Sequence, residues 1–287
     1  MRHAGTGWSR AQKRRRRKRG LLIGFALVVF LLPLLWTTLA SVGITPRTGS
    51  YPPAWSSPYL DGYEEVGTAE RGFWSELATS ALTSSASTVI TIVVGLLASF
   101  SLVHSRLRRK RRLAQAFLVL ASIPVMAYLI PLNGTITALS LHDSFAGVSL
   151  AQATVFIPLA FYVLFGYLAQ SLFDFEEAAR LEGASALQTL IRIVVPVNAP
   201  ALAATAIIVF VLNWNSFLAP MVLSTSHVRT IPIAMSDFLV VDRELDWTTA
   251  AAAIVVSLLP LLLFVAVTHR VLQRFFLCPT HEGGETA

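Results

Sequence analysis

The chain has 287 residues, of which 54% are hydrophobic and only 14% are charged, and its formal net charge is +7. A mean hydropathy of +0.63 excludes an ordinary soluble domain and indicates an integral membrane protein. The single cysteine, Cys278, excludes an intrachain disulfide, and the six histidines show no ligand-like spacing, so we expect no metal site.

The N-terminal tail, residues 1–20, is basic, above all between Lys13 and Arg19. Such a run either holds the start of a first membrane helix in the cytoplasm or binds nucleic acid or acidic lipid. We favour the first interpretation and expect no nucleic-acid partner. The apolar run at 21–42 is longer than the hydrophobic part of a usual signal peptide, so we predict a retained transmembrane helix in contact with lipid. Cleavage near Ser41 is the alternative, and it would leave five spans.

Residues 43–78 form a predicted extracytoplasmic loop, because the composition shifts there to proline, glycine, serine and aromatic residues. Four prolines argue against a long helix in this loop, namely Pro46, Pro52, Pro53 and Pro58. Its aromatic residues suit a surface that lies along the membrane interface.

Five more apolar runs follow, each near the roughly 20 residues that a helix needs to cross about 30 Å of hydrocarbon. They lie at 79–103, 113–140, 146–170, 198–223 and 249–269. No alternating ten-residue pattern indicates a barrel, so these runs are predicted helices. The predicted fold is therefore an all-α, polytopic bundle of six transmembrane helices. The main transmembrane domain covers 79–276, and 277–287 form a cytoplasmic tail.

Side-chain types within the spans indicate how the helices pack. The span at 79–103 is rich in serine and threonine, which allow close approach and interhelical hydrogen bonds, so we expect it to face protein more than lipid. Pro124 and Pro131 in the third span and Pro158 in the fourth each remove a backbone hydrogen bond and favour a kink.

The distribution of lysine and arginine orients the bundle. Nine lie before the first span, six between His104 and Leu113, two between residues 174 and 200, and two after the last span. Only four remain for the opposite side: Arg47, Arg71, Arg229 and Arg243. By the positive-inside rule, both termini and residues 174–200 are predicted to be cytoplasmic.

Charged residues are missing from most of the membrane-spanning sequence. No Asp, Glu, Lys, Arg or His occurs in 113–141, 144–173, 193–226 or 248–268. Ion-coupled carriers usually keep an ionisable residue at membrane depth, so a secondary transporter or channel is the less favoured alternative. A membrane-embedded enzyme would need a cluster of catalytic side chains, and His142 with Asp143 is the only local pair. We therefore expect no catalytic residues and an energy source in a partner.

The segment 174–200 contains two short helices by its capping patterns. Asp174 with Glu177, and Ser185 with Gln188, each have the spacing of a capping box. Gly183 lies between them and can adopt the left-handed conformation that ends a helix. On the second helix an apolar stripe recurs at three and four residues, formed by Leu187, Leu190, Ile191 and Val194. These patterns alone fit either a docking site or a connector between two spans.

The order Glu177-Ala178-Ala179, Glu182-Gly183-Ala184, Ile193 and Pro196 resembles the EAA loop of binding-protein-dependent ABC importer permeases. We call residues 174–200 the EAA segment. Downstream, Trp214-Asn215-Ser216-Phe217 and Thr230-Ile231-Pro232 are similar to signatures of the carbohydrate-importing branch, and the resemblance covers about 79–276. Glu182 stands where the family usually has Asp, and the C-terminal tail differs from the Gly-rich basic tail that often ends proteins of that branch.

The resemblance implies a permease subunit in a bacterial inner membrane that imports a sugar or sugar derivative; another small solute such as a polyamine is the alternative. The implied partners are a second permease in a heterodimer, two ATPase subunits and an extracytoplasmic solute-binding protein. No Walker A pattern occurs in the chain, so ATP and Mg would be bound by the ATPase partners. The implied ATPase-docking residues are Glu177, Ala178, Ala179, Arg180, Glu182, Gly183 and Ala184. Candidates for lining the pathway are Asn133, Asn213 and Asn215, for which interhelical packing is the alternative role.

Overall fold

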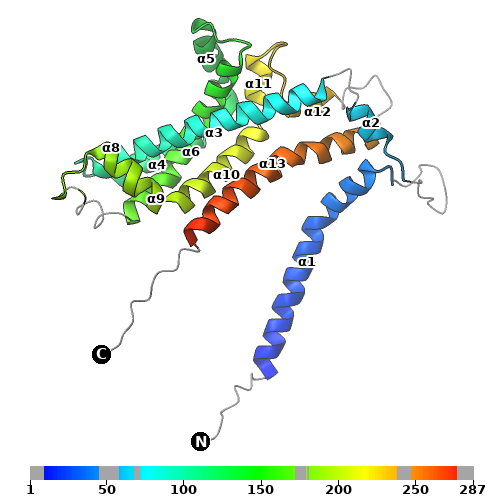
Figure 1. Ribbon diagram of the computed structural model, residues 1–287, viewed down its shortest axis with the longest axis horizontal. Coiled ribbons are helices and arrows are strands. Elements are labelled where there is room, and N and C mark those ends of the chain that lie inside the picture. The colour runs from blue at the N-terminus through cyan, green and yellow to red at the C-terminus, as the bar shows by residue number, and fades with distance from the viewer. Residues whose placement is uncertain are drawn as a thin grey trace, which may run out of the picture. The chain divides into compact units, whose positions relative to one another are not determined.

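The computed structural model describes residues 10–44, 58–67, 72–171, 179, 181–237 and 247–276, and for 10–18, 171, 237 and 271–276 only the backbone. The described residues form helices and no strands, which confirms the predicted all-helical fold (Figure 1). In chain order the helices are α1 (Arg10–Ser41), α2 (Asp61–Gly67), α3 (Phe73–His104), α4 (Lys110–Ala121), α5 (Val125–Ala138), α6 (Phe145–Ser171), α8 (Ala186–Thr189), the π-helical turn η1 (Leu190–Val194), α9 (Val195–Val197), α10 (Ala199–Trp214), α11 (Leu218–Leu223), α12 (Ile231–Asp237) and α13 (Trp247–Phe276).

The chain divides into two compact units. The first comprises Met1–Thr68 and Val241–Val256, and the second comprises Ala69–Val240 and Ser257–Ala287. Helix α13 therefore contributes its start to the first unit and the rest of its length to the second.

Polar contacts hold the first unit together where α1 ends, α2 lies and α13 begins. The hydroxyls of Ser41 and Tyr63 lie 2.8 Å apart, and those of Tyr59 and Thr248 lie 3.1 Å apart. Gly62 comes so close to Thr248 that an added Cβ would lie 3.0 Å from the carbonyl carbon and oxygen of that residue. Glycine at this position therefore allows α2 to pack directly on the start of α13.

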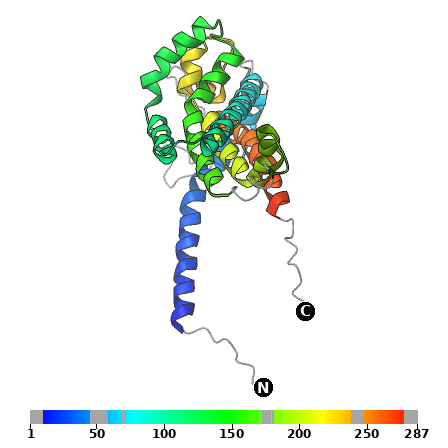
Figure 2. The same cartoon turned by 90° about the vertical axis from the view of Figure 1, so that its left-hand side faces the viewer.

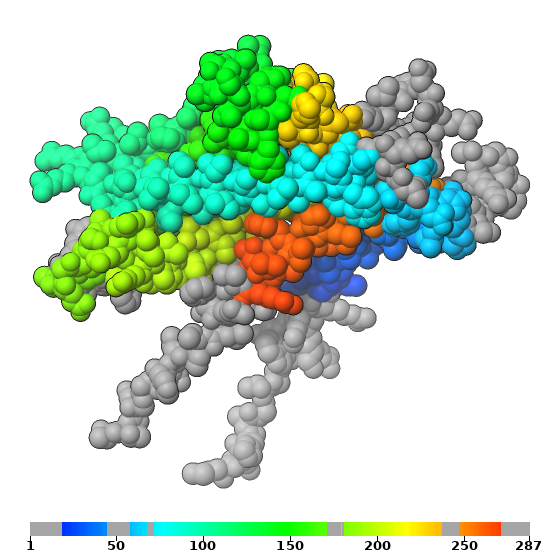
Figure 3. Space-filling model, turned by 45° about the horizontal axis from the view of Figure 1, so that its top comes forward, coloured from blue at the N-terminus to red at the C-terminus, as the bar shows by residue number. Residues whose placement is uncertain are grey.

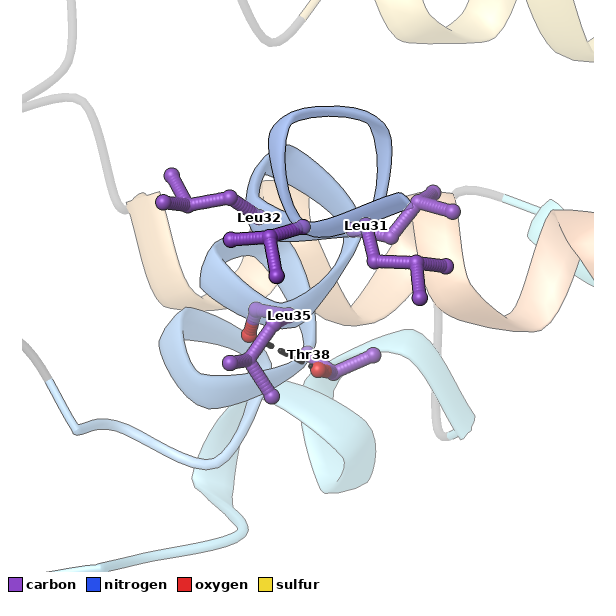
Figure 4. A pocket seen from close by; sticks show the side chains of 6 residues that line it. Leu31, Leu32, Leu35 and Thr38 are labelled. Atoms are coloured by element: carbon purple, nitrogen blue, oxygen red, sulfur yellow. Dashed lines mark hydrogen bonds between the residues drawn. The ribbon is translucent and has the colours of Figure 1, made fainter. Parts of the chain in front are cut away.

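Helix α1 carries an apolar surface that the described residues leave uncovered. Its segment Arg19–Ser41 is long and apolar enough to cross a membrane, and none of its most apolar window is buried. Leucine side chains border a shallow hollow on this helix, with Leu31, Leu32 and Leu35 around it, and the hydroxyl of Thr38 donates to the Leu35 carbonyl at 2.8 Å (Figure 4). The length and exposure agree with the prediction of a lipid-contacting helix at 21–42.

In the second unit, α3, α6 and α10 lie side by side along its length (Figures 1 and 2). Helices α3 and α6 run in the same direction, because Thr91 bonds the Ala153 carbonyl at 3.5 Å and Ser99 bonds the Phe161 carbonyl at 3.0 Å. Between these levels Gly95 allows a close approach, since an added Cβ would lie 3.3 Å from the nearest atoms of α6. The face of α3 that the sequence predicted to meet protein is buried, which confirms that prediction: Ser80, Thr83, Ser84, Ser87, Thr88 and Thr91.

Two apolar cores lie at different levels of α6. The first joins α3, α4 and α6 to Leu190 and Val194 of the EAA segment. The second joins α5, the start of α6, α11 and Val228. In the space-filling view α5 and α11 lie against each other beside α3 (Figure 3). Helix α6 thus takes part in both cores, the one that contains Leu190 and Val194 and the one formed with α5 and α11.

Two of the predicted spans are bent or interrupted. The span predicted at 113–140 consists of α4 and α5, which meet at 89°. The bend falls before Pro124, which has no N–H to donate and disfavours a helical conformation in the residue before it. The span predicted at 198–223 ends at Trp214, and α11 continues after a short turn. In a continuous helix the ring of Pro220 would clash with the Ser216 carbonyl, and the turn avoids this clash.

Other boundaries differ by smaller amounts. Helix α3 begins at Phe73, earlier than the predicted 79, because Phe73 and Glu76 are already buried. Among the described residues, four helices are long and apolar enough to span a membrane, and α4 with α5 and α8–α9 with α10 form two bent pairs that pass the same test together. The six-span count holds if each bent pair crosses once, and it stays a prediction.

Candidate functional site

The EAA segment contains a sharp helix end at Gly183. Among the predicted docking residues, Glu177, Ala178 and Arg180 lie outside the described residues. Gly183 has φ +83°, and the Ala184 amide donates to the Ala179 carbonyl at 3.0 Å. This bond across five residues, with a left-handed residue just before its donor, is the Schellman arrangement that ends a helix. The predicted left-handed conformation of Gly183 is therefore confirmed.

The helix after Gly183 begins with the predicted capping box. The Gln188 amide donates to Ser185 Oγ at 3.3 Å, and the Ser185 amide donates to Gln188 Oε1 at 2.9 Å. Helix α8 then passes into the π-helical turn η1 and into α9, and the chain bends by 78° between Val197 and Ala199. A π-helical turn inserts an extra residue into a helix and is common at functional sites. Residues 185–197, which we call the rod, thus form a short helical stretch with a capped start, and the bend separates this rod from α10.

The predicted apolar stripe of this rod has two sides. Leu190 and Val194 are 5% and 0% exposed and belong to the core formed with α3, α4 and α6. Leu187 and Ile191 are 62% and 58% exposed, and Leu181, just before Gly183, is 86% exposed. One side therefore anchors the rod to the bundle, while the other presents apolar side chains that nothing in the described chain covers. Glu182 and Gly183 are exposed on the same short stretch.

The three asparagines predicted to line a pathway have different surroundings. Asn213 is 1% exposed and lies between α3, α6 and α10, so the structure gives it interhelical contacts. Asn215 is exposed, and its Nδ2 donates to the Val211 carbonyl at 2.7 Å. Asn133 lies on α5, and its Oδ1 is a buried atom with no partner among the described residues. Contact of any of them with solute stays a prediction.

Asp143 forms a polar clamp that the sequence did not reveal. Its φ is +53°, and Ser224 Oγ donates to Asp143 Oδ1 at 2.5 Å. Thr225 Oγ1 and Ser226 Oγ donate to Oδ2 at 2.9 and 3.2 Å, and the His227 amide donates to Oδ1 at 3.1 Å. The Ser224 hydroxyl, with those of Thr225 and Ser226 and the His227 amide, holds the pKa of the Asp143 carboxyl well below its usual range. This carboxylate therefore ties the α5–α6 loop to the loop after α11.

The chain that follows this clamp is fixed to α3. Arg229 Nε lies 3.2 Å from Glu76 Oε1, and the Ile231 amide donates to Ser80 Oγ at 2.6 Å. Within the described ranges no group of three or more His, Cys, Asp or Glu could hold a metal ion. The EAA segment and the clamp at Asp143 therefore lie at different levels of the same bundle.

Residues 91–276 match the family described as the binding-protein-dependent transport system inner membrane component. The chain belongs to this family. Permeases of such importers work with ATPase and solute-binding-protein components, and the family description together with the apolar helices identifies this chain as a multi-pass protein of the bacterial inner membrane.

Individual relatives agree with this membership. The chain is 31% identical to the trehalose transport system permease protein SugB of Mycobacterium tuberculosis over 87% of its own length and 90% of that protein. It is 29% identical to the trehalose/maltose transport system permease protein MalG of Thermococcus litoralis, over 85% and 89% of the two chains. The fold is similar to a chain in the crystal structure of a bacterial ABC transporter involved in the import of the acidic polysaccharide alginate. That match has a TM-score of 0.73 and 22% identity, and covers 95% of this chain and 100% of the other.

Proposed function

We propose that this chain is one permease subunit of an ABC importer for a sugar or sugar derivative, with the EAA segment as the site where an ATPase subunit docks. The observation that carries this proposal is the geometry at Gly183: an exposed apolar surface follows a left-handed helix end, on a rod whose other side is buried in the bundle. The relatives named for trehalose and maltose transport support the solute class.

The EAA segment has the form that force transfer requires. A docked ATPase would contact Leu181, Leu187 and Ile191, which are exposed, together with Glu182 and Gly183. A displacement of the rod would reach the bundle through Leu190 and Val194, because they are packed in the core of α3, α4 and α6. ATP binding then favours whichever arrangement of helices the closed ATPase pair fits better.

The complete importer would contain a second, different permease, two ATPase subunits that bind ATP and Mg, and an extracytoplasmic solute-binding protein. Both termini and the EAA segment would lie in the cytoplasm, as the distribution of lysine and arginine predicts. The clamp at Asp143 would then lie on the extracytoplasmic side, because α3 and α6 each pass from that level to the EAA segment.

Co-purification tests this assignment. The chain is isolated under mild conditions from its native membrane, its partners are identified, and the sugar bound by the co-purified solute-binding protein is determined. We expect an ATPase, a second permease and a binding protein that holds a neutral sugar. A polyamine in the binding protein would refute the solute class, and isolation without any ATPase would refute the importer.

A further inference from the structure

Asn213 lies at the centre of a buried polar cluster that joins three helices. It is 1% exposed in the last turn of α10. Ser87 Oγ of α3 donates to Asn213 Oδ1 at 2.9 Å, and Asn213 Nδ2 donates to Thr88 Oγ1 at 3.4 Å. Gln152 Nε2 of α6 donates to the Asn213 carbonyl at 3.4 Å. Ser87, Thr88 and Gln152 are themselves 0%, 3% and 1% exposed, so all of these bonds are shielded from water.

Several polar side chains on these helices bond within their own helix. Thr205 of α10 is 2% exposed, and its hydroxyl donates to the Ala201 carbonyl at 2.7 Å. Thr88 donates to the Ser84 carbonyl at 2.6 Å in the same way. Asn213 differs because its side chain and its carbonyl together contact both neighbouring helices. In a membrane-embedded bundle such bonds hold helices in a defined register.

The polar cluster and the EAA segment lie at opposite ends of α10. Helix α10 starts directly after the 78° bend that ends the EAA segment. At that end the rod is packed on α3 and α6 through Leu190 and Val194. At the other end, Asn213 bonds the same two helices. Leu202, near the start of α10, packs against the same apolar core. Helix α10 is therefore held to α3 and α6 at both ends, by apolar packing at one and by polar bonds at the other.

We propose that Asn213 is a positioning residue that makes α3, α6 and α10 move as one rigid unit when the EAA segment is displaced. This inference rests on the proposed coupling to an ATPase. Without the bonds of Asn213, the far end of α10 is free to shift against α3 and α6. Work delivered at the EAA segment would then move α10 alone, and ATP would be hydrolysed with less solute transported.

A distance measurement on the complete importer tests the rigid unit directly. Cys278 is first replaced by serine, and spin labels are attached to L82C on α3 and L212C on α10, since both leucines are surface-exposed. In the wild-type background we expect one narrow distance that ATP does not change. Asn213→Ala should broaden this distance or shift it on addition of ATP, whereas the matched control Thr205→Val, on the same helix and as deeply buried, should behave as the wild type.

The functional readout is the amount of radiolabelled trehalose or maltose accumulated per ATP hydrolysed. Asn213→Ala should lower this ratio by about tenfold, within the usual range of coupling between sites, while ATP hydrolysis continues. A purely structural role would reduce the amount of assembled importer and leave the ratio of the remainder unchanged. Ser87→Ala removes the shortest bond with little change in volume, and it provides the test if Asn213→Ala does not assemble.

The outcomes separate the two proposals. An unchanged label distance and an unchanged ratio in both Asn213→Ala and Ser87→Ala would overturn the role of Asn213. A distance that ATP already changes in the wild type would overturn the rigid unit. If the wild-type importer shows no ATP-dependent uptake of any solute, the proposed function fails instead, while the label distance in the absence of nucleotide still reports on the cluster.

Discussion

Replacement of Gly183 offers a quantitative test of the EAA segment, because the cost of a side chain there is conformational alone. The residue has φ +83°, and an added Cβ would meet no atom within 4 Å. A non-glycine residue in the left-handed region costs about 1–2 kcal/mol. A β-branched residue is a stronger outlier, and we assign valine the upper end of backbone strain, about 3 kcal/mol. Asparagine tolerates this conformation best among the others.

These magnitudes predict an order of activity. Since about 1.4 kcal/mol corresponds to a factor of ten, Gly183→Ala should lower the population of the left-handed conformation at this position, and with it uptake, by about five- to thirtyfold. Gly183→Val should lower uptake by about 100-fold, and Gly183→Asn should stay closest to the wild type. The subunit should insert normally in every variant, because Gly183 is exposed and an added Cβ would meet no atom of the described residues within 4 Å.

The assay is ATP-dependent solute uptake by the reconstituted importer, with equal amounts of assembled complex verified for each variant. Normal uptake by Gly183→Val would refute the requirement for a left-handed residue. If Gly183→Asn failed as completely as Gly183→Val, the side chain itself would obstruct docking, and the backbone argument would be wrong.

Three further tests, with five substitutions between them, address other parts of the structure. Leu190→Ala should cost the folded subunit about 2–5 kcal/mol because the residue is 5% exposed. Leu187 is 62% exposed, so Leu187→Ala should leave thermal stability unchanged and weaken ATPase binding. An equal loss of stability in Leu190→Ala and Leu187→Ala would contradict the assignment of one side to the core and the other to the surface. Gly95→Leu should overpack the contact between α3 and α6 and cost about 1–3 kcal/mol, whereas Gly166→Leu has open space and should be tolerated; the reverse order in a thermal melt would refute the close approach. Asp143→Asn should cost about 1–2 kcal/mol at every pH from about 5 to 8. Because the pKa of Asp143 is lowered in the folded state, its contribution to stability is fully present above the ordinary carboxyl pKa of about 3.9. That contribution is lost only as the pH falls towards the folded pKa. A step in wild-type stability near neutral pH that Asp143→Asn abolishes would contradict this account.

Local chemistry made part of the structure predictable. The capping box at Ser185 and the left-handed Gly183 follow from short-range spacing, and both are present. The serine and threonine face of α3 is a periodic signal, and it is buried as expected. In each case the residues that decide the conformation are close together in the sequence.

Features that depend on distant contacts were not predictable in the same way. Asp143 and Ser224 are far apart in the chain, and nothing in either sequence neighbourhood indicates that they bond. The apolar stripe of the EAA segment was visible, but only the packing of Leu190 on α3 and α6 shows which side is buried. Hydropathy also could not show that a run such as 113–140 contains two helices at 89°, although Pro124 marks the position of the bend.

Reconstitution with and without the ATPase subunits tests most directly whether this chain depends on work done by a partner. Liposomes that contain the chain with its second permease, the ATPase subunits and the solute-binding protein should accumulate sugar when ATP is supplied on the ATPase side. Liposomes that contain the chain without the ATPase subunits should accumulate none, with or without ATP. Concentration of sugar against its gradient by the chain alone would contradict the account.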